Sequence, residues 1–205
     1  MLRIYITRHG QDEDDANGIL NGRRDAPLTD RGIAQAEKTA SNIKELGLVF
    51  DAIYTSPLSR AEKTANIIAE AIGGPAPEIF AELIEREFGV MTGLLISQIE
   101  EKCSPQILKT ATITYFLDPK GAETFEDLSA RARHLLGELR YRHKDGNILL
   151  VTHGDIGKMI YAAYYHLGWR DTLEMFHFGN TDLLLLAEDS PATEAHVFKA
   201  KQHNL

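Results

Sequence analysis

Short runs of apolar residues alternate along this chain with longer stretches in which apolar side chains recur at helical spacing. The runs typical of buried strands lie at residues 2–7, 52–55 and 148–152. Helical spacing marks residues 29–46, 58–72, 124–142 and 156–167. Strands that alternate with helices in this way predict βαβ units, and therefore a three-layer α/β/α sandwich with a mainly parallel central sheet.

Capping and turn residues set the expected limits of the first helices. Thr29 precedes the first helix and Gly47 follows it. Ser56 is expected to cap the second helix, with Pro57 at its first helical position. Residues 11–27 are polar and aperiodic, which predicts a loop, and a loop of this length is often functional.

The pattern is less regular in the middle of the chain. We expect a loop at residues 82–93 and a helix at 97–109. Two closing strands are expected at residues 181–187 and 195–199. No repeat, low-complexity segment or linker interrupts the pattern, and a chain of 205 residues suits one domain.

Charge and composition exclude several classes of protein. The formal net charge is −8 and there is no basic run, so nucleic acid is not an expected partner. No window approaches the roughly 18 consecutive apolar residues of a membrane span, and no signal segment precedes the first strand. The single cysteine, Cys103, cannot form an intrachain disulfide. We expect a cytoplasmic protein that does not bind membranes.

Two histidines follow strand-like runs in the same setting. Arg8-His9-Gly10 ends the first run, and Thr152-His153-Gly154 ends a later one. Ligands bind at the carboxyl ends of strands in open α/β sheets, and the arginine beside His9 suits an anionic substrate. A neutral imidazole aimed in line can accept a phosphoryl group. The pair therefore favours phosphoryl chemistry, with structural strand-end histidines as the alternative.

Arg60 and Glu85 are further candidates for the same chemistry. Arg60 begins a helix after a strand and could clamp a phosphate, although a surface arginine is the simpler interpretation of that segment alone. Glu85 could donate a proton to a leaving oxygen, as Glu82 or Glu87 equally could. The acidic run at residues 12–15 could hold a divalent cation, but a solvated loop is favoured, so we expect no metal and no cofactor.

Seven blocks of the sequence, taken in order, resemble the motifs of the histidine phosphatase superfamily, the phosphoglycerate mutase-like family. Two of them are Thr7-Arg8-His9-Gly10 and Val151-Thr152-His153-Gly154. The others lie at residues 25–32, 56–65, 85–93, 121–131 and 179–181. The resemblance runs nearly end to end. It implies a phosphoglycerate mutase-like fold in a single domain, residues 1–205, with a small cap-like insert at about 94–122.

Carried over by position, the resemblance implies a role for each matching catalytic residue. His9 is the nucleophile that becomes phosphohistidine. Arg8, Arg60 and His153 hold the phosphoryl oxygens and stabilise the transition state. Glu85 is the proton donor to the leaving group and afterwards the base for water.

Two loop residues complete the phosphate site that the resemblance implies. Asn17 reaches the phosphate from the loop, and Gly22 approaches the substrate with its backbone. The spacing from Arg8 to Asn17 is two residues longer than in the common mutase pattern, so Asp15 stands where asparagine is expected. Which of Asn17 and Asp15 faces the phosphate is left open by the sequence.

Two departures from the mutase pattern favour hydrolysis. Asp155-Ile156-Gly157 replaces the usual Gly-x-x-Arg after the second histidine, and the segment between Gly93 and Glu123 lacks the arginine- and tyrosine-rich insert of glycolytic mutases. A mutase needs a second anion site, for which the sequence offers little beyond Arg23, Arg24 and Arg86. We expect metal-independent hydrolysis of a small phosphorylated metabolite. The alternatives are a cofactor-dependent phosphoglycerate mutase and a non-catalytic phospho-ligand binding protein.

Overall fold

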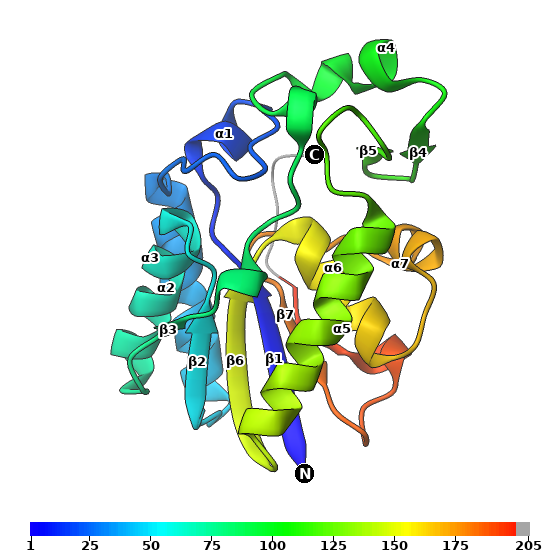
Figure 1. Cartoon of the computed structure of the whole chain (residues 1–205). Coiled ribbons are helices and arrows are strands. Elements are labelled where there is room, and N and C mark those ends of the chain that lie inside the picture. The colour runs from blue at the N-terminus through cyan, green and yellow to red at the C-terminus, as the bar shows by residue number, and fades with distance from the viewer. Residues whose placement is uncertain (200–205) are drawn as a thin grey trace.

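A six-stranded sheet lies at the centre of the computed structural model, which describes residues 1–199 (Figure 1). Across the sheet the strands are β3 (Glu78–Ile79), β2 (Ala52–Thr55), β6 (Gly146–Thr152), β1 (Leu2–Arg8), β7 (Leu183–Leu186) and β8 (His196–Phe198). The first four run parallel, whereas β7 and β8 are antiparallel to their neighbours. The predicted mainly parallel sheet is confirmed.

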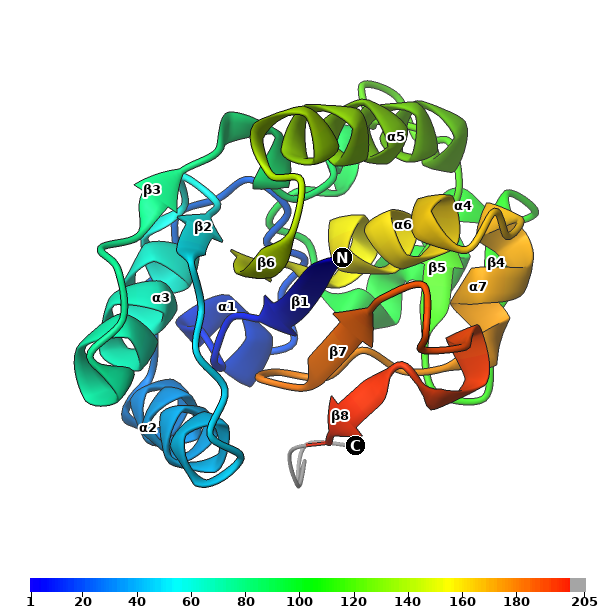
Figure 2. The ribbon, with the colours of Figure 1, turned by 90° about the horizontal axis from the view of Figure 1, so that it is seen from below.

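Helices cover both faces of this sheet, as the view along the strands shows (Figure 2). One face carries α2 (Asp30–Glu45) and α3 (Ser59–Ile72). The other carries α5 (Phe125–Arg142) and α6 (Gly154–Tyr164), with α7 (Trp169–Met175) beside α6. The expected three-layer α/β/α architecture is therefore confirmed.

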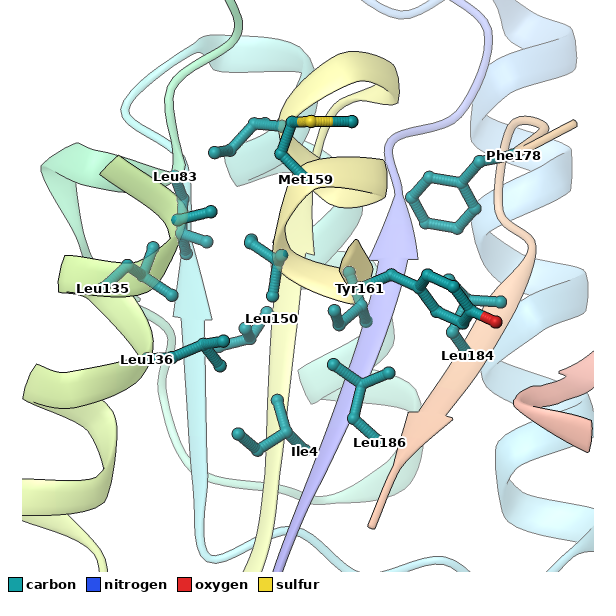
Figure 3. Close-up of a cluster of buried hydrophobic side chains, with 14 of the residues drawn as sticks. Ile4, Leu83, Leu135, Leu136, Leu150, Met159, Tyr161, Phe178, Leu184 and Leu186 are labelled. Atoms are coloured by element: carbon teal, nitrogen blue, oxygen red, sulfur yellow. The ribbon is translucent and has the colours of Figure 1, made fainter. Parts of the chain in front are cut away.

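The central strands bury apolar side chains on both of their faces. In β1, Ile4 and Ile6 pack in the cluster that includes α5 and α6, while Tyr5 between them packs in the cluster that includes α2 and α3. Figure 3 shows part of the first cluster, to which β6 contributes Leu150, β1 contributes Ile4 and α6 contributes Met159. Each fully buried side chain of this size contributes about 1.5–3 kcal/mol relative to exposure. The two faces together explain why these strands are continuous apolar runs.

Threonine hydroxyls cap two of the long helices. Thr29 accepts a hydrogen bond from the Gly32 amide, and Thr124 accepts one from the Asp127 amide. The predicted cap at Ser56 is wrong, because α3 has Leu58 at its N-cap position. The Ser56 hydroxyl lies before the helix and accepts from the Leu58 amide instead.

The expected helix at residues 97–109 is only partly present. Helix α4 covers Ile99–Cys103, and the chain then forms strand β4 (Ile107–Lys109), which pairs antiparallel with β5 (Thr114–Phe116). Pro105 ends the helix because its nitrogen carries no hydrogen for the helical ladder. The expected loop at residues 11–27 contains a short helix, α1 (Glu13–Ala16).

Three of these short elements lie above the carboxyl ends of β1 and β6 in Figure 1: α1, α4 and the β4–β5 hairpin. A small apolar cluster joins α4 and β5 to the segment that follows α1, and it consists of Leu20, Phe88, Met91, Ile99, Cys103 and Phe116. This arrangement covers the edge of the sheet where the two histidine motifs end. Among the described residues, no helix combines the length and apolar character needed to cross a membrane.

Candidate active site

The two motif histidines lie against each other at the end of the sheet. Strands β1 and β6 pair with Arg8 opposite Thr152, so the next residue of each strand is a histidine. The rings of His9 and His153 have centroids 4.9 Å apart and an interplanar angle of 60°. Both side chains are buried. The parallel register therefore produces the pair that the sequence suggests.

Backbone contacts fix the orientation of the His9 ring. Its Nδ1 lies 2.7 Å from the carbonyl oxygen of Gly10, which can only accept, so Nδ1 carries the proton and Nε2 keeps its lone pair. The Gly10 amide donates to Thr64 Oγ1 at 3.1 Å. A side chain at Gly10 would collide with the carbonyl of Gly32, which explains the glycine after the histidine.

The electrostatic environment keeps His9 neutral. Burial, together with the positive charges of Arg60 and Arg8, holds the pKa of His9 well below its ordinary value. A neutral imidazole with an unprotonated Nε2 is the form that can attack phosphorus. Geometry and charge thus prepare the same nitrogen for nucleophilic attack.

Arg60 is fully buried and packs on His9. Its Nε lies 3.2 Å from His9 Nε2 and 3.2 Å from a carboxylate oxygen of Asp12. Its two terminal nitrogens donate to the carbonyls of Arg24, at 2.6 Å, and Gly22, at 2.8 Å. The guanidinium is therefore held on several sides beside Nε2, and it is not the surface arginine that its own segment suggested.

The acidic run at residues 12–15 is not the solvated loop that we expected. Asp12 is fully buried, where it caps α1, pairs with Arg60 and accepts a hydrogen bond from Asn21. Burial and the charge of Asp15 raise the pKa of Asp12 to about 6. Asp14 is also buried and pairs with Arg24 at 2.8 Å. Ion pairs with Arg60 and Arg24 therefore stabilise these two carboxylates in their buried positions.

Arg8 and His153 each direct one unpaired buried nitrogen into the site. Arg8 Nη2 bonds to Asp15, whereas Arg8 Nε has no partner among the described residues. The Ser56 hydroxyl, which accepts from Leu58, can donate to His153 Nε2 at 2.7 Å. This leaves His153 Nδ1 with the proton and without a partner in the described part of the chain. Buried donors without partners are the groups that an anion would satisfy.

Glu85 lies at the amino end of α6. One carboxylate oxygen accepts from the amides of Arg86 and Ile156, and the other accepts from the amide of Asp155. Burial, and after it the charge of Asp155, raises the pKa of Glu85. A Cβ built on Gly154 would lie 3.7 Å from this carboxylate and 4.0 Å from Arg8 Cζ, so both groups face one point. A carboxyl that keeps a proton there can protonate a leaving oxygen.

The chain belongs to the histidine phosphatase superfamily. The family model for the histidine phosphatase superfamily (branch 1) matches residues 4–199. A 2,3-bisphosphoglycerate-dependent phosphoglycerate mutase from Rhizobium etli is 30% identical over 177 residues, covering 84% of this chain and 85% of that protein.

Two solved structures share the fold at somewhat lower identity. Phosphoserine phosphatase from Entamoeba histolytica, in complex with 3-phosphoglyceric acid, is 27% identical, with a TM-score of 0.76 and coverage of 100% of both chains. A mycobacterial glucosyl-3-phosphoglycerate phosphatase with VO3 is 26% identical, with a TM-score of 0.77 and coverage of 90% and 92%.

In this histidine phosphatase, Asp15 and not Asn17 lies beside the phosphate-site residues. Asp15 accepts from Arg8 at 2.9 Å and from Asn180 at 3.1 Å. Asn17 ends α1 as an exposed residue and donates to the carbonyl of Glu13, so the turn of helix from Asp12 carries position 15 inward and position 17 outward. The placement of Asn17 against the phosphate site is therefore wrong.

Gly22 reaches the histidine phosphatase site through its carbonyl. That oxygen accepts from Arg60, and the residue has a positive φ of 51°. A Cβ at this position would also press against the Phe88 ring. Glycine is required here both by the backbone conformation and by the close contact.

Two residues within the motif blocks, Arg131 and Asn180, had no role assigned from the sequence, and the structure shows what each contacts. Arg131 donates to the carbonyls of Glu82 and Ile84 and pairs with Glu123 through two nitrogens, which holds the loop that carries Glu85. Asn180 donates to the carbonyl of His9 at 3.0 Å as well as to Asp15. Their places in the motifs were the only signal of these roles in the sequence.

A metal ion does not suit this cluster. His9, Asp12 and Asp15 each offer one ligand atom, and these atoms lie within 4.8 Å of one another. The two carboxylates are already paired with Arg60 and Arg8, and these guanidinium groups would repel a cation. The same positive charges favour an anion such as a phosphoryl group.

A cavity of about 140 Å³ opens beside Arg8, Asp15 and Glu85. Its apolar wall is formed by Ile19, Leu20, Phe88, Ile96, Ile99, Ile113, Phe116 and Phe178. A second, outer hollow of about 550 Å³ shares Arg8 and Asp15 with the first. His9, Arg60 and His153 line neither cavity, so a substrate in the inner cavity would meet the site from the side of Arg8 and Glu85.

Proposed function

We propose that this protein hydrolyses a phosphomonoester of a small metabolite through a phosphohistidine at His9, without a metal. The observation that carries the proposal is the buried, neutral His9, whose unprotonated Nε2 lies among Arg8, Arg60 and His153. Preorganised donors of this kind supply a large part of enzymatic catalysis.

In the first step, the Nε2 lone pair of His9 attacks phosphorus while the bond to the leaving oxygen breaks. Arg8, Arg60 and His153 Nδ1 donate hydrogen bonds to the equatorial oxygens. The Glu85 carboxyl gives its proton to the leaving oxygen, and its raised pKa supports this role. The products are the free alcohol and phosphohistidine.

In the second step, water attacks the phosphohistidine. The Glu85 carboxylate takes a proton from this water as the new bond to phosphorus forms and the bond to Nε2 breaks. Inorganic phosphate is released, and the protonated Glu85 is ready for another cycle. The same carboxyl serves as acid and then as base, as in other two-step hydrolyses.

Charge pairing supports hydrolysis over phosphate transfer between two positions of a substrate. A mutase must hold a second anionic group while its intermediate turns. The three arginines that could do so are occupied: Arg86 pairs with Asp155 at 2.7 Å, Arg24 pairs with Asp14, and Arg23 lies near Glu87 and Glu123. The phosphatases among the structural relatives favour the same activity, whereas the curated relatives are named as mutases.

The test is the hydrolysis of p-nitrophenyl phosphate by the wild type and by His9→Ala. We expect the variant to lose nearly all activity, while the matched control Asn17→Ala keeps the wild-type rate. A trapped phosphoenzyme should be labile to acid, and the reaction should persist in EDTA. A His9→Ala protein with the wild-type rate would refute the proposal, and efficient isomerisation of 3-phosphoglycerate with trace 2,3-bisphosphoglycerate would replace it by the mutase.

A further inference from the structure

Lys158 is a buried lysine that the proposed reaction does not use. It lies on α6 and lines the inner cavity, with 2% of its surface exposed. It follows Gly154, which faces Arg8 and Glu85, by four residues, so the two positions share a helix face and are separated by about 6 Å along the axis. Lys158 is therefore farther along the cavity wall from the point where the phosphoryl group would react.

Lys158 and its neighbour Tyr115 each keep one donor without a hydrogen-bond partner among the described residues. Lys158 Nζ donates to Tyr115 Oη at 3.1 Å and to the carbonyl of Leu173 at 3.0 Å, and an ammonium group has a third N–H. Lysine cannot accept, so the Tyr115 oxygen accepts and its own O–H is still available. Tyr115 also lines the inner cavity. One N–H and one O–H are thus available next to the same wall.

No carboxylate neutralises this ammonium among the residues that the structure describes. Asp155 is nearby on the same helix, but its ion pair within 4 Å is with Arg86 and not with Lys158. Arg86 is itself enclosed by the rings of Phe116 and Phe125, each 4.3 Å from its Cζ. A buried charge without a partner is costly, and a bound anion would compensate it.

The other residues of the cavity wall indicate which chemical group could carry such an anion. Ile99, Ile113, Phe116 and Phe178 give this wall apolar surface, and the charged residues Asp155 and Arg86 on the same wall are paired with each other. One unit of positive charge and two donors suit a carboxylate better than a second phosphate, which would bring more charge and more acceptors. The cavity volume of about 140 Å³ restricts the group to a compact one.

We propose that Lys158 and Tyr115 bind a carboxylate at the far end of the leaving group. The preferred substrates are then phosphomonoesters with a compact apolar body and one carboxylate. The proposal rests on the proposed function only in treating the occupant as the leaving group of a phosphate ester. The binding site itself can be tested without turnover.

The experiment compares 4-carboxyphenyl phosphate with phenyl phosphate, which differ only in the carboxylate. We expect the wild type to favour the carboxylated ester by about tenfold or more in kcat/KM, mainly through KM. In Lys158→Met this ratio should fall to about one. Lys102→Met, which removes the same charge from α4 outside the cavity, should keep the wild-type ratio. Equal rates in the wild type, or an unchanged ratio in Lys158→Met, would overturn the proposal.

Binding of the products separates this proposal from the proposed function. By calorimetry, 4-hydroxybenzoate should bind the wild type more tightly than phenol, and Lys158→Met should abolish the difference. If this holds while neither ester is hydrolysed, the carboxylate site stands and the hydrolase proposal fails. If both esters are hydrolysed without preference, the hydrolase proposal stands and the carboxylate site fails. If Lys158→Met does not fold, Tyr115→Phe provides the test, because it removes one donor and should lower the ratio severalfold.

Discussion

Replacement of Asp15 by asparagine should make the protein a faster phosphatase. Asp15 accepts from Arg8 and Asn180, so its carboxylate occupies donors that a phosphoryl group would use. Burial acts to raise the pKa of Asp15, but the attraction of Arg8 and the hydrogen bond from Asn180 outweigh it, so the pKa is lowered. The carboxylate is therefore charged at neutral pH and repels an incoming phosphate.

The size of this repulsion follows from the geometry. The ligand atoms of Asp15 and His9 lie within 4.8 Å of each other, and at this distance two like unit charges repel by about 3.5 kcal/mol in an effective dielectric of about 20. The Asp15 side chain is 20% exposed, so water and Arg8 reduce the effect. We retain about 1.4 kcal/mol, which corresponds to about tenfold in kcat/KM.

The assay is kcat/KM for p-nitrophenyl phosphate between pH 5 and pH 8. Asp15→Asn should exceed the wild type by about tenfold at pH 7.5. A bound phosphoryl group raises the pKa of Asp15, so the wild type can take up a proton at low pH and the gap should narrow toward pH 5. Glu13→Gln is the matched control, since it removes one exposed charge from the same helix. An Asp15→Asn variant that is slower at every pH would show that Asp15 supports Arg8 and does not oppose the substrate.

Three further predictions concern buried charges. Burial and the charge of Asp155 raise the pKa of Glu85, so Asp155→Asn should move the alkaline limb of the pH profile of kcat/KM to lower pH. A limb that does not move would exclude Glu85 as the proton donor. Arg60→Ala should abolish turnover, and in urea titrations it should lower the free energy of unfolding by about 3 kcal/mol. This loss should be smaller at pH 5 than at pH 8, because Asp12 without its cation can be protonated at low pH. Burial lowers the pKa of Lys158 to about 8, against the opposing charge of Asp155, so this lysine destabilises the fold below pH 8 and the penalty disappears toward pH 10.5. Lys158→Met should therefore have a higher free energy of unfolding than the wild type at pH 7 in urea titrations. The gain should be at most about 3 kcal/mol, reduced by the loss of two hydrogen bonds. A difference between variant and wild type that is the same at pH 7 and pH 10 would contradict this.

The sheet and its covering helices were predictable because each follows a local pattern. Strands β1 and β6 are apolar runs, and Thr29 and Thr124 mark helix starts with side chains that satisfy the first amides. The expected helix at residues 97–109 fails because its apolar spacing continues past Pro105, where hairpin pairing takes over. Short apolar segments do not distinguish a helix from a strand without such partners.

The pairing of His9 and His153 was predictable for a different reason, namely that parallel strands bring their carboxyl ends together. The burial of Asp12 was not predictable, because a run of acidic residues is ordinarily solvated and its partner Arg60 is distant in the sequence. The inward turn of Asp15 likewise depends on the phase of α1, which begins at a cap formed by Asp12. Spacing counted along a loop cannot supply that phase.

The backbone contact beside His9 limits how the sequence can change. Gly10 faces the carbonyl of Gly32, and a Cβ at Gly32 would in turn collide with the carbonyl of Gln11. The turn that follows His9 therefore packs tightly against the first turn of α2, a helix that lines neither the inner nor the outer cavity. In a mutational scan selected for turnover, Gly32 should be as intolerant as a residue that touches substrate. Substitutions on the outer surface of α2 should be tolerated, but a substitution in its first turn would displace the backbone that positions His9 Nε2.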